Sequence, residues 1–300
     1  MKFLDRLLIT YFQGVLEIIS IAPPPITYYA LRTTGSWFRN FSQYASSYEP
    51  GVLKRAAHNI EKSTIQTKSS IHLIKDYLRF ETRFVLENIW IRKSRDRYIK
   101  KGFNKSDIQA LRQLLGRPHV IVTAHNSGIC MLVKLLEILG HQSHFICMNV
   151  LNCPRERATP MQRAFQKMWL SWCRTQPMIY VEDGNVLSKS REALSSGHSV
   201  ILAMDVPGYR DGVKADLLGL SVMFPTGAAR IANECGVPML VAIPWATGCR
   251  SRYRIFLKTF RPTGEIRVDT TKMVGYLQDV LSLNPACWNG WLYIDKMLDE

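Results

Sequence analysis

From residue 118 to the C-terminal end, short apolar runs alternate with segments of helical periodicity. The apolar runs cover residues 119–124, 144–148, 178–181, 199–204 and 239–243, and residues 253–259 alternate like a half-exposed strand. Helical patterns lie between and after them, at 126–139, 159–173, up to 195, 226–235 and 269–283. Strands that alternate with helices build largely parallel sheets covered by helices. The sequence therefore predicts an α/β domain over residues 118–300.

The apolar composition of residues 1–25 predicts a helix that contacts a membrane. The stretch 7–22 is apolar apart from Gln13, Glu17 and a few small or hydroxyl residues. It is shorter than the roughly 20 residues that a spanning helix needs, so a helix lying in the membrane interface is favoured over a span. A helix docked in a hydrophobic groove and an ordinary core helix are the alternatives. The prolines at 23–25 end the helix.

Residues 26–117 predict a basic helical arm that packs as one unit with the α/β domain. Between positions 52 and 101, thirteen Lys and Arg residues against five Asp and Glu residues give a formal charge of +8, over half of the chain's +15. Such an arm next to an apolar segment favours attachment to an anionic membrane. The alternative is a solvated face of a helical pair. Nucleic acid is not an expected partner, because no nucleic-acid-binding module is recognisable.

The seven cysteines are scattered, and no two of them form a C-x-x-C pair. An odd number at such spacings argues against a disulfide framework and against a zinc site. The sequence therefore predicts no metal site and a reducing, cytoplasmic environment.

Two polar residues follow apolar runs at positions suited to chemistry. His125 follows the run 119–124, and Asp205 follows 199–204. Ligand sites of open α/β sheets lie at the carboxyl ends of the strands, and a histidine there can act as a general base. Asn126 and Ser127 lead into a helix through small residues, which leaves room for a reacting group. The alternative for His125 is a structural histidine.

A second candidate site is the helix start at Thr226, Gly227 and Arg230. Thr226 is an N-cap candidate, Gly227 allows close approach of a ligand, and Arg230 lies one turn into the helix. A helix N-terminus beside a cation is suited to binding an anion. A capped helix without a ligand is the alternative.

Four passages resemble the lysophospholipid acyltransferase superfamily, specifically the late (lauroyl and myristoyl) acyltransferases of lipid A biosynthesis. In order they are 123–130 (TAHNSGIC), 191–200 (REALSSGHSV) leading to Asp205, 224–230 (FPTGAAR) and 237–244 (VPMLVAIP). The resemblance covers the chain from about residue 56 to the C-terminal end.

The resemblance implies an acyltransferase-like fold with a membrane-anchoring N-terminal element, at the cytoplasmic face of the bacterial inner membrane. It implies an acyl donor held as a phosphopantetheine thioester on an acidic carrier protein, with no other cofactor, and a lipid A or related glycolipid acceptor. His125 matches the family's catalytic base. Asn126 and Ser127 would contact substrate, and Thr226, Gly227 and Arg230 would hold a phosphate of the acceptor or of the donor.

The chain departs from the family pattern at position 130. The family's histidine is followed five positions later by Glu or Asp, which orients the ring, and here that position is Cys130. Asp205 could orient His125 instead, or Cys130 could accept the acyl group covalently. A more electrophilic donor, such as the glycyl thioester of the lipid A glycyltransferases, could also need less assistance. An inert buried thiol is the fourth possibility.

The sequence thus predicts a transferase that moves an acyl or aminoacyl group to a glycolipid hydroxyl. The alternative is a catalytically inactive relative that keeps the fold and binds lipid or a partner, because loss of the acid is compatible with that too.

Removal of residues 1–25 should shift the protein from the membrane fraction toward the soluble fraction, since the apolar stretch is lost. High salt should weaken the association further, because charge attraction is screened within about 10 Å at 0.1 M salt. Fractionation of full-length and truncated protein at low and high salt measures both effects. A full-length protein that is freely soluble at low salt without detergent would show that the membrane hypothesis is wrong.

Overall fold

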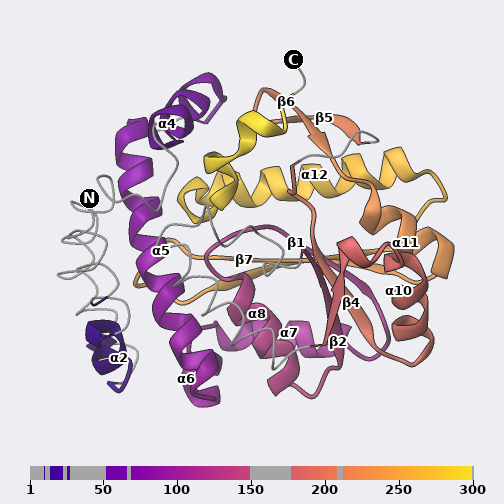
Figure 1. The fold of residues 1–300 in the computed structure, drawn as a ribbon, viewed down its shortest axis with the longest axis horizontal. Helices are drawn as coiled ribbons and strands as arrows, with labels where there is room; N and C mark the ends of the chain where they lie inside the picture. Colours follow the sequence, from indigo (N-terminus) through magenta and orange to yellow (C-terminus); the bar gives the residue numbers. More distant parts are fainter. Residues whose placement is uncertain are drawn as a thin grey trace.

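The structure is a computed structural model, and it describes Thr10 and residues 14–22, 26–27, 52–65, 69–148, 177–207 and 212–298 (Figure 1). The helix expected at 159–173 and the first part of the apolar stretch 7–22 lie outside the described residues.

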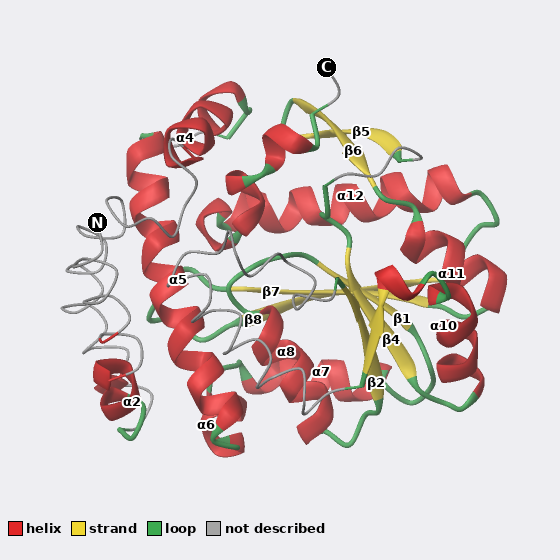
Figure 2. Ribbon diagram, in the orientation of Figure 1, coloured by secondary structure: helices red, strands yellow, loops and turns green. Residues whose placement is uncertain are grey.

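A six-stranded sheet forms the centre of the fold (Figure 2). Its strand order is β3-β2-β4-β1-β7-β8, and every neighbouring pair is parallel except β7 and β8. The strands are β1 (Val120–Thr123), β2 (Ser143–Cys147), β3 (Met178–Tyr180), β4 (Ser199–Ala203), β7 (Met239–Trp245) and β8 (Arg254–Phe260). Residues of β1 and β7 up to Ile243 are almost completely buried, as expected for central parallel strands. The predicted α/β class with a largely parallel sheet is confirmed, and its likeness to an acyltransferase fold stays a prediction.

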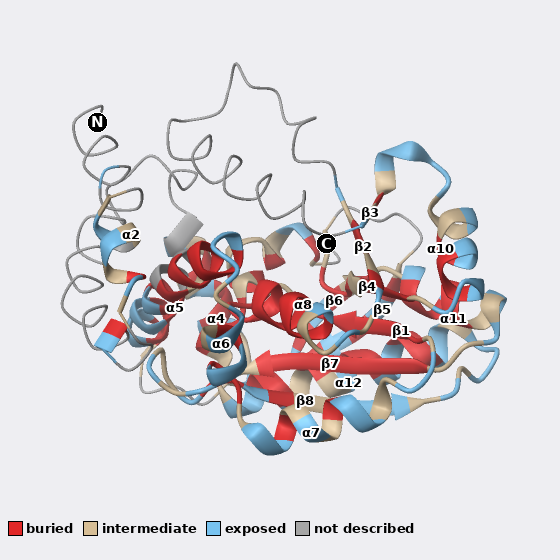
Figure 3. Cartoon of the chain, turned by 90° about the horizontal axis from the view of Figure 1, so that it is seen from below, coloured by how far each residue is buried: buried red, intermediate tan, exposed pale blue. Residues whose placement is uncertain are grey.

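Helices flank the sheet, and α12 lies on the other side of β7 from α7 and α8 (Figures 1 and 2). The flanking helices are α7 (Lys105–Leu114), α8 (Ile129–Ile138), α10 (Val186–Ser195), α11 (Gly227–Cys235) and α12 (Ile266–Leu283). Figure 3 shows the buried residues concentrated in the sheet and on the inner sides of these helices. The core therefore lies on both faces of the sheet, as in doubly wound α/β folds.

The basic region 52–101 forms three helices, α4 (Val52–Lys62), α5 (Ser70–Arg92) and α6 (Asp96–Lys101). α5 and α6 pack against α8, and α4 and α5 also pack against short 3₁₀-helices near the C-terminus. A short helix, α2 (Leu16–Ile19), lies beside α5. Within the described residues, no helix combines the length and the apolar composition that crossing a bilayer requires.

Two features were not predicted from the sequence. β5 (Val213–Leu217) and β6 (Leu220–Phe224) form an antiparallel hairpin, whose two-residue turn has positive φ at Leu218 (56°) and Gly219 (79°). Beyond α12, the chain forms the 3₁₀-helices Pro285–Cys287, Asn289–Leu292 and Ile294–Lys296. The hairpin contacts this C-terminal segment, because Met223 N–H donates to Met297 O at 2.8 Å.

Four histidines gather near the amino ends of the central strands. His144 Nε2 lies 3.1 Å from His198 Nδ1, and their rings stack. His141 Nε2 lies 2.8 Å from Ser199 Oγ, which also accepts the backbone N–H of His119 at 2.9 Å. Burial, followed by neighbouring positive groups, lowers the pKa of His141 and His144, and burial lowers the pKa of His119.

His119, His141 and His144 should make the fold less stable in acid. A folded-state pKa below the unfolded value of about 6.5 means that the unfolded chain binds more protons at these groups, so their contribution to stability rises with pH below about 6.5 and is level above it. Urea unfolding between pH 5 and 8 should show this loss, and His144→Gln should reduce its slope. His58→Gln, at an exposed position of α4, is the matched control and should leave the slope unchanged. An unfolding free energy that stays constant down to pH 5 would contradict the account.

Candidate active site

The register of two neighbouring strands brings His125 and Asp205 together. β1 and β4 are parallel, and Thr123 at the end of β1 pairs with Ala203 at the end of β4. Each polar residue follows its strand's last residue by two positions. The carboxyl ends of parallel strands meet at one edge of the sheet, so equal offsets bring the two side chains to the same place.

The Asp205 carboxylate binds His125 through both its backbone and its ring. His125 N–H donates to Oδ1 at 2.9 Å and Oδ2 at 3.0 Å, and His125 Nδ1 lies 3.0 Å from Oδ1. Asp205 is completely buried, whereas the imidazole is 41% exposed. An ionised carboxylate only accepts hydrogen bonds, so Nδ1 carries the proton. Nε2 then presents a lone pair, and none of the described residues occupies it.

Two aromatic side chains from the C-terminal segment complete the environment of Asp205. Trp288 Nε1–H donates to Oδ2 at 2.6 Å, and the Tyr293 hydroxyl lies 3.4 Å from the same oxygen. The Tyr293 ring also meets the His125 ring edge-on at 6.1 Å between centroids. The segment is fixed to the loop after β1, because Asn289 N–H donates to His125 O at 2.8 Å. Sequence reasoning missed both residues, and the only signal was a group of aromatic residues near the C-terminus.

The three titratable groups influence one another. Burial alone would lower the pKa of His125, but the Asp205 charge and its hydrogen bonds outweigh burial and raise it. Burial alone would raise the pKa of Asp205, but His125 and the Trp288 N–H hold it below its ordinary value. Burial and the Asp205 charge raise the pKa of Tyr293 well above its ordinary value, so the phenol stays neutral. Near neutral pH the carboxylate of Asp205 is therefore ionised and the Tyr293 phenol is neutral, while the carboxylate favours the protonated form of His125.

An apolar cavity of about 490 Å³ opens beside His125. It is lined by His125, Phe145, Ile146, Cys147, Met148, Val181, Val186, Leu202, Ala203, Met204, Val206, Pro225, Gly227, Ala228 and Ile231. Among these described residues there is no Asp, Glu, Lys or Arg. The volume falls in the range of about 300–1,000 Å³ that is typical of small-molecule sites. The cavity is therefore suited to a hydrocarbon group placed next to the imidazole.

The first residues of α11 contribute to the lining of this cavity. Gly227 and Ala228, its first two residues, line the cavity. Thr226 occupies the N-cap position, but its side chain caps none of the helix N–H groups. The N-terminal end of a helix carries a partial positive charge, which favours a negative group nearby. Arg230 is exposed and does not line the cavity. Of the predicted anion site, the structure thus brings only Gly227 to the lining at His125.

Asn126 and Ser127 are buried and do not line the cavity. The Asn126 side chain donates to Pro244 O at 2.6 Å and accepts the N–H of Gly128 at 3.2 Å. Both residues precede α8, because Gly128 stands at the N-cap and the helix begins at Ile129 rather than at position 126. These hydrogen bonds give Asn126 a structural role, and contact of either residue with substrate stays a prediction.

Cys130 is also buried, with 1% of its surface exposed, in the first turn of α8. It belongs to the hydrophobic core and does not line the cavity at His125. Because this thiol does not line the cavity, the geometry gives no support to covalent transfer through Cys130. The role of Cys130 stays untested.

The described residues contain no group of three or more His, Cys, Asp or Glu side chains arranged to hold a metal ion. Comparison with known proteins finds no family model that matches this chain, and no curated protein matches it. The resemblance to lipid A acyltransferases therefore remains a hypothesis that rests on the motifs and on the geometry of the site.

The pKa of His125 should depend on the charge of Asp205. In the native protein it should lie above the ordinary value of about 6.5. In Asp205→Asn the charge is gone and burial remains, so the pKa should fall to about 6.5 or lower. NMR titration of the His125 ring in both proteins measures this. The same pKa in both proteins would show that Asp205 does not control the ring.

Proposed function

We propose that this chain is an acyltransferase that moves a fatty acyl group from a carrier-protein thioester to a hydroxyl of a lipid A-type glycolipid. The observation that carries the proposal is an imidazole, backed by a buried carboxylate, at the side of an apolar cavity. The imidazole supplies a base near neutral pH, and the cavity supplies a place for the chain of the donor.

In this proposal His125 is the general base. Nε2 takes the proton of the acceptor hydroxyl as that oxygen attacks the thioester carbonyl. The imidazolium that forms is stabilised by Asp205, which already binds Nδ1–H. The tetrahedral intermediate then collapses, the carbon–sulfur bond breaks, and the proton passes from Nε2 to the departing thiolate. The products are an ester and the carrier thiol of phosphopantetheine, so no cofactor is consumed.

The start of α11 would stabilise the negative oxygen of that intermediate. Gly227 and Ala228 line the same cavity as His125, and no side chain caps the helix end. Preorganised N–H dipoles of this kind favour a developing oxyanion. The role proposed here for the helix end differs from phosphate binding by Thr226 and Arg230, which do not line the cavity.

The cavity favours a fatty acyl group over an aminoacyl group. An aminoacyl thioester carries an ammonium group, and burying an unpaired charge is unfavourable. None of the described lining residues is an acid that would pair with it. Hydrocarbon, in contrast, gains about 0.8 kcal/mol for each CH₂ group that it buries. Asp205 is not available to pair with the ammonium group either, because its oxygens already accept hydrogen bonds from His125 and Trp288.

Asp205 could replace the acid that is missing at position 130. Its carboxylate lies within hydrogen-bond distance of His125 Nδ1, which is the contact that the family's orienting acid is expected to make. Of the accounts for the departure at Cys130, this geometry supports the one in which Asp205 orients His125.

Membrane attachment is part of the proposal and is supported by α2. Glu17 pairs with Arg92, the last residue of α5, and with Lys93 at its C-cap, which directs one side of α2 toward the rest of the protein. Ile18 and Ile21 are 72% and 60% exposed. Exposed aliphatic side chains beside Lys and Arg are typical of helices that lie on anionic bilayers. The proposed location is the cytoplasmic face of the bacterial inner membrane, where the basic arm would also meet an acidic carrier protein.

Purified full-length protein should transfer a lauroyl group from carrier protein to lipid A in mixed micelles, and a glycyl group far more slowly. Mass spectrometry of the lipid measures both products. His125→Ala should abolish transfer, because no base remains. Cys130→Ala should retain most activity, because direct transfer needs no thiol.

Three results would contradict the proposal in different ways. Faster glycyl transfer would show that the cavity does not select the donor. An acyl group trapped on Cys130 would replace direct transfer by a covalent route. Lipid binding without transfer of any thioester, by protein with a native thermal melt, would favour the inactive lipid-binding relative.

A further inference from the structure

A polar cavity lies at the same edge of the sheet as His125, in the loop that joins β7 to β8. β7 is parallel to β1, so its carboxyl end meets the same edge as His125, on the side of β1 opposite to β4. The cavity has a volume of about 300 Å³. It is lined by Asp76, Arg79, Phe80, Thr247, Gly248, Cys249, Arg250, Ser251 and Asn284. No step of the proposed acyl transfer uses these residues.

A buried arginine fixes the shape of this loop. Arg83 on α5 is fully buried, and its Nη1 donates to Ser251 O at 2.6 Å and to Cys249 O at 3.3 Å. Its Nε donates to Glu87 at 2.5 Å, and its guanidinium stacks over Tyr253 at 3.8 Å. A buried guanidinium needs partners for its N–H donors, so these contacts hold the two carbonyls of the loop in place.

The hydrogen bonds from Arg83 also fix the direction of two backbone N–H groups in the loop. All described peptide bonds are trans, so a carbonyl and the N–H of the next residue point in opposite directions. The carbonyls of Cys249 and Ser251 point to Arg83, and the N–H groups of Arg250 and Arg252 therefore point away from it. Neither N–H has a hydrogen-bond partner among the described residues.

Two arginine side chains add positive charge to the lining. Arg79 pairs with Asp76 at 2.5 Å, which leaves most of its five N–H donors for other partners. Arg250 is exposed and forms no ion pair with any described residue. These charges also act on the Cys249 thiol. Burial raises its pKa, the positive charges of Arg79, Arg83 and Arg250 lower it, and the negative charge of Asp76 raises it. With one acid against two arginines, the lining is net positive.

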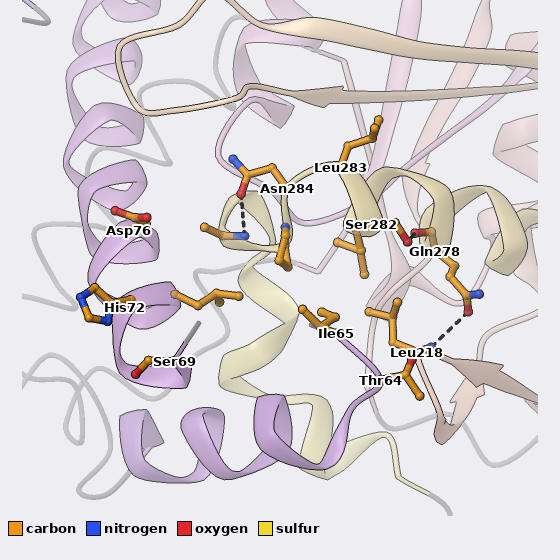
Figure 4. A pocket seen from close by; sticks show the side chains of 14 residues that line it. Thr64, Ile65, Ser69, His72, Asp76, Leu218, Gln278, Ser282, Leu283 and Asn284 are labelled. Carbon is orange, nitrogen blue, oxygen red and sulfur yellow. Dashed lines mark hydrogen bonds between the residues drawn. The ribbon is translucent and has the colours of Figure 1, made fainter. Parts of the chain in front are cut away.

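A second, larger cavity of about 710 Å³ adjoins it, and both are lined by Asp76 and Asn284. Figure 4 shows this larger cavity between α5 and the end of α12, with Asp76 on one side and Asn284 and Ser282 on the other. Ser69, His72 and Gln278 add further polar groups to its lining. A ligand held at the arginines would thus have room for a polar, hydroxyl-bearing remainder.

We propose that the loop between β7 and β8 binds a phosphoryl group of a polar ligand through Arg79 and Arg250. Arginine is the side chain best suited to this task, because its planar guanidinium matches the oxygens of a phosphate. The phosphoryl group could belong to a phosphorylated sugar headgroup or to phosphopantetheine, and both share the chemistry. Phosphoryl binding by this loop does not depend on acyl transfer, whereas the choice of these two ligands rests on the proposed function.

Calorimetric titration of the full chain with glucosamine 1-phosphate, 4′-phosphopantetheine and inorganic phosphate tests the proposal. At least one phosphorylated ligand should bind, and glucosamine and pantetheine without phosphate should not. Arg250→Gln and Arg79→Gln should each weaken binding about tenfold or more, the usual effect of losing a charge-assisted hydrogen bond. The ligand with the lower Kd identifies the source of the phosphoryl group.

Arg252→Gln is the matched control, because Arg252 is exposed on the same loop but does not line the cavity, and it should leave binding unchanged. Arg230→Gln should also leave it unchanged. The proposal is overturned if no phosphorylated ligand binds, if Arg252→Gln weakens binding as much as Arg250→Gln, or if the loss follows Arg230→Gln, which would place the phosphate at α11.

Discussion

The buried carboxylate of Asp205 is the constraint on which the site depends. Removing a carboxylate from water is unfavourable unless its oxygens accept enough hydrogen bonds. Here the donors come from the backbone and ring of His125, from Trp288 and from Tyr293. These residues belong to the loop after β1 and to the C-terminal segment, so the charge can be buried only when the sheet and the last part of the chain are assembled together.

The need of Asp205 for hydrogen-bond donors also explains why the C-terminal segment lies at the carboxyl ends of β1 and β4. Asn289 N–H binds the carbonyl of His125, and Ser127 N–H binds that of Cys287. Further along, Met297 accepts from Met223 on the hairpin. The C-terminal segment thus connects the hairpin to the candidate active site. Arg83 and Glu87 form a buried charge pair, and Arg83 also binds two carbonyls of the loop between β7 and β8. The buried Asp205 carboxylate and the Arg83–Glu87 pair therefore both organise polar groups at one edge of the sheet.

Local patterns in the sequence were sufficient to predict most of the sheet and the position of His125. The runs at 119–124 and 199–204 place His125 and Asp205 at strand ends, but only the observed pairing of β1 with β4 shows that the two side chains meet. Trp288 and Tyr293 were missed because their contacts with Asp205 span more than 80 positions and leave no periodic pattern. The hairpin of β5 and β6 was missed because its turn places Leu218 at positive φ, where glycine or asparagine is usual. The burial of Asn126 depends on Pro244, which is equally distant in the sequence.

We propose that Asp205 does for His125 what an acid at position 130 would do in the late acyltransferases that the sequence motifs resemble. The most direct test is the transfer rate of Asp205→Asn relative to the native protein, at a pH where His125 is neutral in both. The account predicts a fall of roughly 10⁴-fold, as when the orienting acid of a Ser-His-Asp triad is made neutral, in protein that keeps a native melt. A rate within about tenfold of the native value would contradict it, because a factor of ten corresponds to only 1.4 kcal/mol of transition-state stabilisation.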